Sequence, residues 1–176
     1  MKKRYFLQTG AALVGVIALS RYWPLGAAEP KAALQPAAGN DPKGNHFEVT
    51  KTEAEWRKAL TPAQFSVLRK QDTERPFSSP LDKLTTAGTY SCAGCSLPLY
   101  SSSTKFDSGT GWPSFSAPLD NAVATTSDKS FLMARTEVHC RRCGGHLGHV
   151  FDDGPPPTGQ RYCMNGAALI FTETAS

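Results

Sequence analysis

Four of the five cysteines in this 176-residue chain form two C-x-x-C pairs, Cys92 with Cys95 and Cys140 with Cys143. This spacing is typical of a tetrahedral zinc site, in which two short turns each present two thiolates to one ion. Because 44 residues separate Cys95 from Cys140, the metal would join two segments that a larger sheet structure already brings close. Four thiolates leave no position for water, so this zinc would be structural. Two disulfides, which an exported chain could form, are the alternative.

The fifth cysteine, Cys163, stands apart from both pairs. A single thiol in a chain that also carries two closely spaced histidines, His146 and His149, is a candidate nucleophile. The alternative is an inert buried cysteine that serves only as a small apolar side chain.

The N-terminus has the pattern of an export signal over residues 1–28. Basic residues at 2–4 precede an apolar run at 11–19, and small residues follow at 26–28. The apolar run is short for a membrane span, although an uncleaved signal would act as an anchor. Residues 3–8 also resemble a twin-arginine signal with lysine in place of the first arginine. We therefore expect an exported protein, located in a bacterial periplasm.

The charge distribution supports the same boundary. All of the formal charge of +4 comes from residues 1–28, which contain four basic residues and no acidic one. The remaining chain is neutral and has no net field to attract nucleic acid or anionic lipid. Alanine and proline dominate residues 29–44, which predicts a flexible tether before a domain at 45–173.

Helices are predicted only near the start of this domain. Thr50 with Glu53, and Thr61 with Gln64, match the capping box that begins a helix. The buried faces would carry the large apolar side chains of this region: Trp56, Leu60, Phe65 and Leu68.

The second half of the chain has the composition of a β domain. Residues 71–83 contain prolines and paired serines and predict an irregular segment. Strand-forming residues at 88–90, 130–138 and 167–172 then alternate with glycine, proline and serine. Short strands with frequent turns and no intervening helices predict a mainly β fold with antiparallel sheets.

Three motifs closely resemble the type B methionine sulfoxide reductases: SGTGWPSF at 108–115, HLGHVF at 146–151 and RYCMNGAAL at 161–169. The resemblance extends over about residues 45–172. It implies reduction of the R epimer of methionine sulfoxide in oxidised proteins by a nucleophilic cysteine. It also implies two antiparallel sheets packed as a sandwich-like β-tent domain, with helices on the N-terminal side and zinc knuckles.

The residues around Cys163 suit this chemistry. A cysteine attacks only as a thiolate, which cationic and hydrogen-bonding neighbours favour. Arg161 and Asn165 each stand two positions from Cys163 and would share its face of a strand. Arg161 would bind substrate or stabilise the thiolate, and Asn165 would hold a histidine or a bound water. Trp112 would offer an apolar wall to the S-methyl group of the substrate. The alternatives are a core role for Trp112 and a purely structural charge at Arg161.

The two histidines are the candidate proton donors. By resemblance, His149 is the general acid, and His146 binds and orients the sulfoxide. A structural role or metal binding by these rings is the alternative. We assign Phe115 and Phe151 to the core and leave Glu137 open as a partner of the site.

One position departs from the family pattern. Many relatives have a second cysteine in the motif that here reads Gly109-Thr110-Gly111, and they form an internal disulfide with it. Thr110 cannot do so. We therefore predict that an external thiol, thioredoxin-like or small, resolves a sulfenic acid on Cys163. We expect a monomer. A zinc-stabilised module that binds a ligand without catalysis is the competing hypothesis.

Overall fold

The computed structural model describes residues 46–128 and 134–175, and all of them belong to one compact unit of the chain. The predicted signal, the whole predicted tether and the start of the strand predicted at 130–138 fall outside the described residues. Within the described part of the chain, no helix has the length and apolarity that a membrane span requires.

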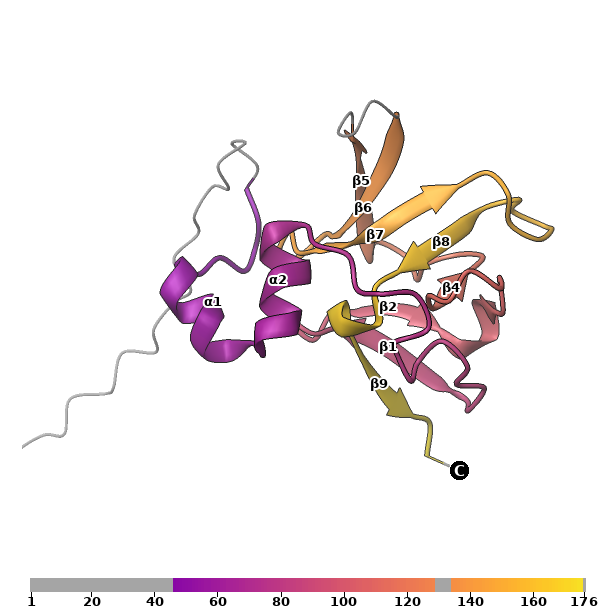
Figure 1. The fold of residues 1–176 in the computed structure, drawn as a ribbon, viewed down its shortest axis with the longest axis horizontal. Helices are drawn as coiled ribbons and strands as arrows, with labels where there is room; N and C mark the ends of the chain where they lie inside the picture. Colours follow the sequence, from indigo (N-terminus) through magenta and orange to yellow (C-terminus); the bar gives the residue numbers. More distant parts are fainter. Residues whose placement is uncertain (1–45, 129–133, 176) are drawn as a thin grey trace, which may run out of the picture. The chain divides into compact units, whose positions relative to one another are not determined.

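Two short helices open the described domain, α1 (Glu53–Ala59) and α2 (Pro62–Lys70) (Figure 1). Helix α2 begins as predicted, with Thr61 and Gln64 forming a capping box and a proline at the first turn. The prediction for α1 was wrong by two residues, since its capping box joins Thr52 to Glu55. The sequence offers the same Thr-x-x-Glu spacing twice in succession, and the later pair starts the helix.

The apolar side chains predicted to face the core, Trp56, Leu60, Phe65 and Leu68, are all buried. Helix α2 packs against strand β7 (His146–Phe151) and the 3-10 turn η3 (Gly166–Ala168). Helix α2 therefore covers the strand that carries both histidines and the turn that follows Cys163 in the chain. The segment after α2 has no regular structure up to residue 87, which confirms the irregular segment predicted at 71–83.

All strand pairs are antiparallel and form two sheets (Figure 1). The first has the order β2-β1-β9, with β2 at Pro98–Ser101, β1 at Gly88–Cys92 and β9 at Leu169–Glu173. The second has the order β3-β4-β8-β7-β6-β5. Its further strands are β3 (Lys105–Phe106), β4 (Ser114–Phe115), β5 (Val123–Asp128), β6 (Arg135–Cys140) and β8 (Arg161–Met164), and the 3-10 turn η1 (Ser102–Thr104) precedes β3.

Aromatic rings join the two sheets in the core. The Phe115 ring of β4 stacks on Tyr100 of β2 at 4.3 Å and meets Tyr90 of β1 edge-on at 5.0 Å. All three side chains are fully buried, and the Tyr100 hydroxyl donates to the Met164 sulfur at 3.1 Å. Rings in these arrangements add packing energy to the burial of their surface. The predicted fold of two packed antiparallel sheets with N-terminal helices is confirmed.

Candidate active site

Two hairpin turns bring the paired cysteines together. Cys92 and Cys95 belong to the turn between β1 and β2, and Cys140 and Cys143 to the turn between β6 and β7. Their four sulfur atoms lie within 4.8 Å of one another, with Cys92–Cys143 at 3.7 Å and Cys95–Cys140 at 3.5 Å. The turns predicted for the two pairs are thus confirmed.

This quartet fits a zinc ion. Thiolates about 2.3 Å from a tetrahedral zinc stand roughly 3.8 Å from each other, close to the spacings found here. The Gly94 N–H also points at the Cys92 sulfur, at 3.4 Å. All five cysteines are free, which contradicts the disulfide alternative. Without a cation, the hydrogen bonds with Cys140, Cys92 and Cys95 and burial raise the pKa of Cys143, so this thiol resists ionisation. A bound zinc would reverse this preference and hold all four as thiolates.

The fifth cysteine occupies the middle of the larger sheet. Cys163 on β8 pairs with Ser114 of β4 on one side and with His149 of β7 on the other. Residues directly opposite in antiparallel strands project to the same face, so the thiol stands between these two side chains. It is half-buried, and this desolvation raises the pKa of Cys163 against the opposing effects of Thr110, Arg161 and Ser114.

A glycine makes this close pairing possible. A Cβ atom at Gly148 would collide with the carbonyl oxygen of Cys163 and crowd the backbone of Met164. Because the position has no side chain, β7 approaches β8 closely and places His149 beside the thiol.

His149 combines partial burial with a carboxylate partner. Its Nε2 lies 2.9 Å from Asp128 Oδ2, and Arg135 Nη2 contacts the same oxygen at 2.9 Å. Desolvation lowers the pKa of His149 despite the hydrogen bond that the ring donates to Asp128, so the neutral ring is favoured near pH 7. Asp128 fixes the ring beside Cys163.

His146 lies in the same site but is more deeply buried. Its Nδ1 lies 2.8 Å from Glu137 Oε1, which also accepts from Gln71 Nε2 at 3.0 Å. The ring is edge-on to His149 with centroids 5.4 Å apart. Its Nε2 is buried and has no hydrogen-bond partner, so a polar atom of a ligand or a water would satisfy it. Glu137, whose role the sequence left open, therefore orients the His146 ring.

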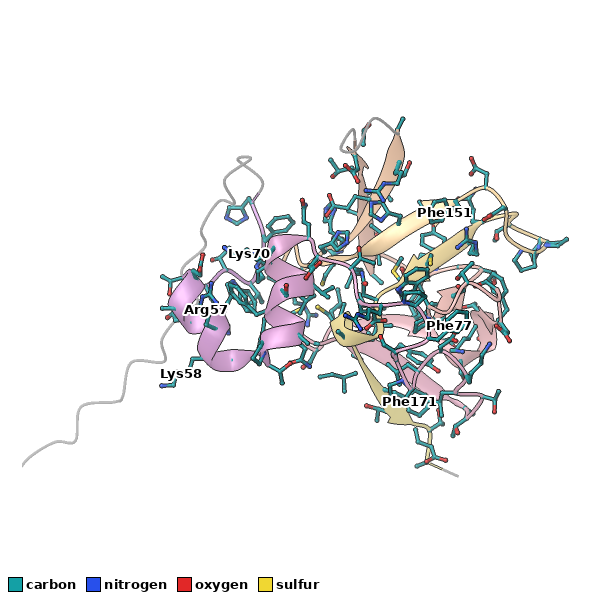
Figure 2. The ribbon with its side chains drawn as sticks, viewed as in Figure 1. Arg57, Lys58, Lys70, Phe77, Phe151 and Phe171 are labelled. Atoms are coloured by element: carbon teal, nitrogen blue, oxygen red, sulfur yellow. The ribbon has the colours of Figure 1, made fainter. Side chains whose placement is uncertain are left out.

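Arg161 lies on β8 two residues from Cys163, and a carboxylate holds it. Nε and Nη2 bind the two oxygens of Asp153 at 2.8 and 2.9 Å. The guanidinium also stacks on the Phe151 ring at 4.4 Å (Figure 2 labels this phenylalanine). Phe151 is half-buried beside the site, so its assignment to the core was wrong; that of Phe115 was right.

The Asn165 side chain binds backbone groups rather than a histidine ring. Its Nδ2 donates to the Leu147 carbonyl at 3.0 Å, and its Oδ1 accepts from the Glu74 N–H at 3.0 Å. The chain leaves the regular strand at Met164, so the two-residue alternation that predicted a shared face no longer applies. Asn165 instead fixes the backbone between the two histidines.

Glu74 is a residue that sequence reasoning missed. Its carboxylate accepts from the Gly166 and Ala167 N–H groups at 2.6 and 2.9 Å, where η3 begins. Its carbonyl accepts from Trp112 Nε1 at 3.1 Å. One loop residue thus ties the predicted substrate wall to the segment after Cys163. No local motif marks it, because its partners are distant in sequence.

The loop that follows Glu74 also exposes a large apolar side chain. Phe77 is 65% exposed, and its N–H donates to the Gly111 carbonyl at 2.7 Å (Figure 2). The ring lies against Gly111, the residue before the half-buried Trp112. Trp112 is therefore at the rim of the site rather than in the closed core.

Family comparison decides between an enzyme and a binding module. The SelR domain model matches residues 60–173, more than half of the chain. The chain belongs to the SelR family. Proteins named peptide methionine sulfoxide reductase MsrB are similar over nearly their whole length. The protein of Agrobacterium fabrum is 53% identical over 70% of this chain and 93% of its own length. That of Pseudomonas syringae is 56% identical over 69% of this chain and 94% of its own length.

A third relative, the MsrB of Leptospira interrogans, is 52% identical over 72% of this chain and 97% of its own. The chain is thus a SelR-family oxidoreductase of the peptide methionine sulfoxide reductase type, and the expectation of an enzyme is confirmed. Among solved structures, the Mis18 'Yippee-like' domain is similar with a TM-score of 0.43 and 18% identity, over 51% of this chain and 99% of that one. No inference is drawn from that likeness.

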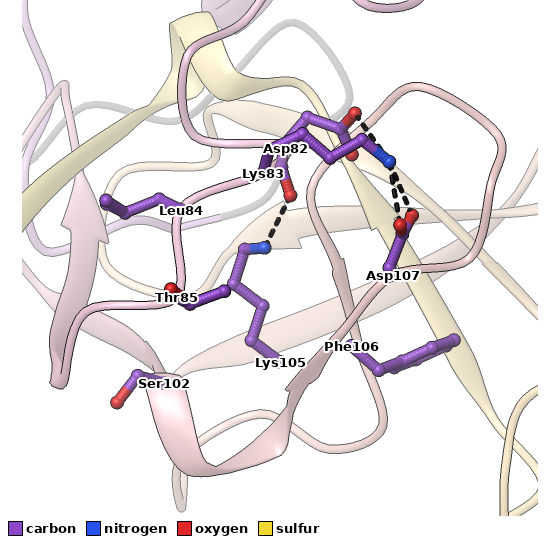
Figure 3. A pocket seen from close by; sticks show the side chains of 8 residues that line it. All are labelled: Asp82, Lys83, Leu84, Thr85, Ser102, Lys105, Phe106 and Asp107. Carbon is purple, nitrogen blue, oxygen red and sulfur yellow. Dashed lines mark hydrogen bonds and ion pairs between the residues drawn. The ribbon is translucent and has the colours of Figure 1, made fainter.

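A hollow elsewhere on this SelR domain carries different chemistry. It has a volume of about 220 Å³ and lies against β3 (Figure 3). Lys83 binds both oxygens of Asp107, and Lys105 donates to the Asp82 carbonyl. Its charged groups are paired within the hollow, and neither Cys163 nor a histidine lines it.

Proposed function

We propose that Cys163 reduces the R epimer of methionine sulfoxide in oxidised proteins. The observation that carries the proposal is the pairing of Cys163 with His149, beside a second histidine whose Nε2 is buried and unpartnered. A sulfoxide needs a soft nucleophile at its sulfur and a hydrogen-bonding or acidic group at its oxygen. The site offers both within one face of the sheet.

In the first step, oxygen passes from the sulfoxide to Cys163. The cysteine sulfur loses two electrons and becomes a sulfenic acid, while the substrate sulfur gains two and becomes a thioether. His149, when protonated on both ring nitrogens, supplies a proton to the oxygen as its bond to the substrate sulfur breaks, and Asp128 accepts from Nε2 and favours this charged form. His146 Nε2 binds the sulfoxide, with Glu137 fixing its ring.

In the second step, an external thiol regenerates Cys163. The thiol attacks the sulfenic acid, releases water and forms a mixed disulfide, which a second thiol reduces to free Cys163 and an external disulfide. Thr110 supports this cycle because it lies 3.9 Å from the Cys163 sulfur, where a cysteine would form an internal disulfide. A small thiol or a thioredoxin-like dithiol meets the chemical requirement.

The exposed ring of Phe77 supports a polypeptide substrate. It lies against Gly111 and offers apolar surface outside the reacting centre. Side chains that flank an oxidised methionine would contact it, whereas free methionine sulfoxide would not reach it. The Cys₄ quartet would hold one structural zinc ion, and residues 1–28 would direct the protein to the periplasm.

Rates on each sulfoxide epimer with a generic dithiol test the proposal. We expect turnover of the R epimer alone, abolished in Cys163→Ser with zinc content unchanged. Wild-type protein inert toward both epimers would overturn it. Mass spectrometry after one turnover without reductant should find a sulfenic acid on Cys163, and an intramolecular disulfide would contradict the external-thiol cycle.

A further inference from the structure

Three hydroxyl groups connect the Cys163 thiol to a backbone carbonyl. Thr110 Oγ1 lies 3.9 Å from Cys163 Sγ, and Ser108 Oγ is 2.8 Å from both Thr110 Oγ1 and Ser114 Oγ. Ser114 is fully buried, and its hydroxyl donates to the Trp112 carbonyl at 3.1 Å. A continuous line of hydrogen bonds therefore runs from the reactive sulfur into the core.

The protons of this line permit two arrangements that run in opposite directions, and only the first keeps the bond from Ser114 to the Trp112 carbonyl. Each hydroxyl has one proton to donate and can accept at its oxygen. With a neutral thiol, the sulfur donates to Thr110, and the bonds run on through Ser108 and Ser114 to the carbonyl. After Cys163 loses its proton to solvent, Ser114 donates to Ser108, Ser108 to Thr110 and Thr110 to the sulfur. Only rotation of three O–H groups separates the two arrangements.

We propose that Ser114, Ser108 and Thr110 form a reversible hydroxyl chain that stabilises the Cys163 thiolate, with Thr110 donating to the sulfur. The inference rests on the proposed function, in which this thiolate is the nucleophile. A cysteine at this position would resolve the sulfenic acid, whereas Thr110 stabilises the thiolate.

The charged groups around the thiol are engaged by carboxylates, so the thiolate gains from further hydrogen-bond donors. Arg161 on the same strand attracts the thiolate, but Asp153 binds two of its nitrogens. His149 faces the thiol from β7, and its Nε2 is engaged by Asp128. Burial of the thiol opposes its ionisation, and neutral hydroxyls counter this without adding charge.

The pH dependence of Cys163 alkylation tests the chain in zinc-loaded protein, with iodoacetamide as probe and the modified peptide quantified by mass spectrometry. Thr110→Val keeps the side-chain shape but removes the donor. We expect the midpoint to rise by roughly one pH unit, since a hydrogen bond to a charged group is worth at least that much. Alkylation at neutral pH then falls about tenfold. Thr110→Ser should restore the wild-type midpoint.

Ser108→Ala removes the middle of the chain without touching the sulfur, and we expect a smaller rise. It also carries the test if Thr110→Val does not fold. Thr125→Val, at an exposed position on the far strand β5, is the matched control and should keep the wild-type midpoint.

An unchanged midpoint in Thr110→Val would overturn the inference, as would a raised midpoint in Thr110→Ser. If Thr110→Val does not fold, an unchanged midpoint in Ser108→Ala would overturn it instead. The assay contains no sulfoxide, so it separates this inference from the proposed function. Protein that reduces neither epimer but shows the expected midpoints would refute the function and support the hydroxyl chain.

Discussion

Replacing Glu74 with alanine tests whether one loop residue holds the active-site segment in place. Its carboxylate is the acceptor for the Gly166 and Ala167 N–H groups. A buried donor left without an acceptor costs about 1–3 kcal/mol. Because Glu74 is half-buried, water can replace part of each bond, and we take the lower end, about 1–1.5 kcal/mol for each group.

The two bonds together predict a loss of about 2–3 kcal/mol in the free energy of unfolding. For a domain of this size, 1 kcal/mol shifts the thermal midpoint by roughly 3–5 °C, so we expect a fall of about 10 °C. Glu74→Gln keeps one acceptor oxygen and should lose about half as much. Since Glu74 also positions Trp112 through its carbonyl, KM for an oxidised peptide should rise more than kcat falls.

Thermal unfolding followed by circular dichroism, with KM and kcat on the same samples, provides the measurement. Glu173→Ala is a matched control, since Glu173 is an exposed carboxylate at the end of β9. Unfolding of Glu74→Ala at the wild-type midpoint would refute the reasoning. So would equal effects of the alanine and glutamine variants, because only one of them removes both acceptors.

Three further predictions concern the metal, the titration of a histidine and the contact between β7 and β8. Stripping zinc with a chelator, or Cys140→Ser, should lower the thermal midpoint together with the measured zinc content, since metal binding free energy is folding free energy; a chelated protein with the wild-type midpoint would contradict a structural ion. The pKa of His149 is lowered from 6.5, so its contribution to stability is present above pH 6.5 and is lost as pH falls through the folded-state pKa. Urea midpoints should therefore fall less on acidification in His149→Gln than in wild type, and parallel pH curves would count against this. Gly148→Ala should cost about 1–3 kcal/mol in urea unfolding and slow Cys163 alkylation, because the added Cβ forces β7 away from β8; wild-type behaviour in both assays would show that the strands tolerate a side chain there.

The sequence predicts this site best where short spacing determines geometry. Within each C-x-x-C pair, the hairpin turn alone brings the two sulfur atoms together. The four cysteines form one cluster, as predicted. Alternation along β8 correctly placed Arg161 on the face of Cys163 but failed for Asn165, because the strand ends at Met164. Glu74 was missed because its bonds join segments about ninety residues apart, which no local pattern encodes.

The separation of Cys163 from the zinc-binding cysteines supports the proposed recycling by an external thiol. Cys163 lies opposite His149, whereas Cys140 bonds to the Gly145 carbonyl at the other end of β7. His149 is four positions along the chain from Gly145, which is about 13 Å along an extended strand. A disulfide requires Cα atoms no more than about 7 Å apart. Cys140 therefore cannot resolve a sulfenic acid on Cys163 unless the β6–β7 hairpin unfolds and the metal site is lost, which supports an external thiol as the proposed route.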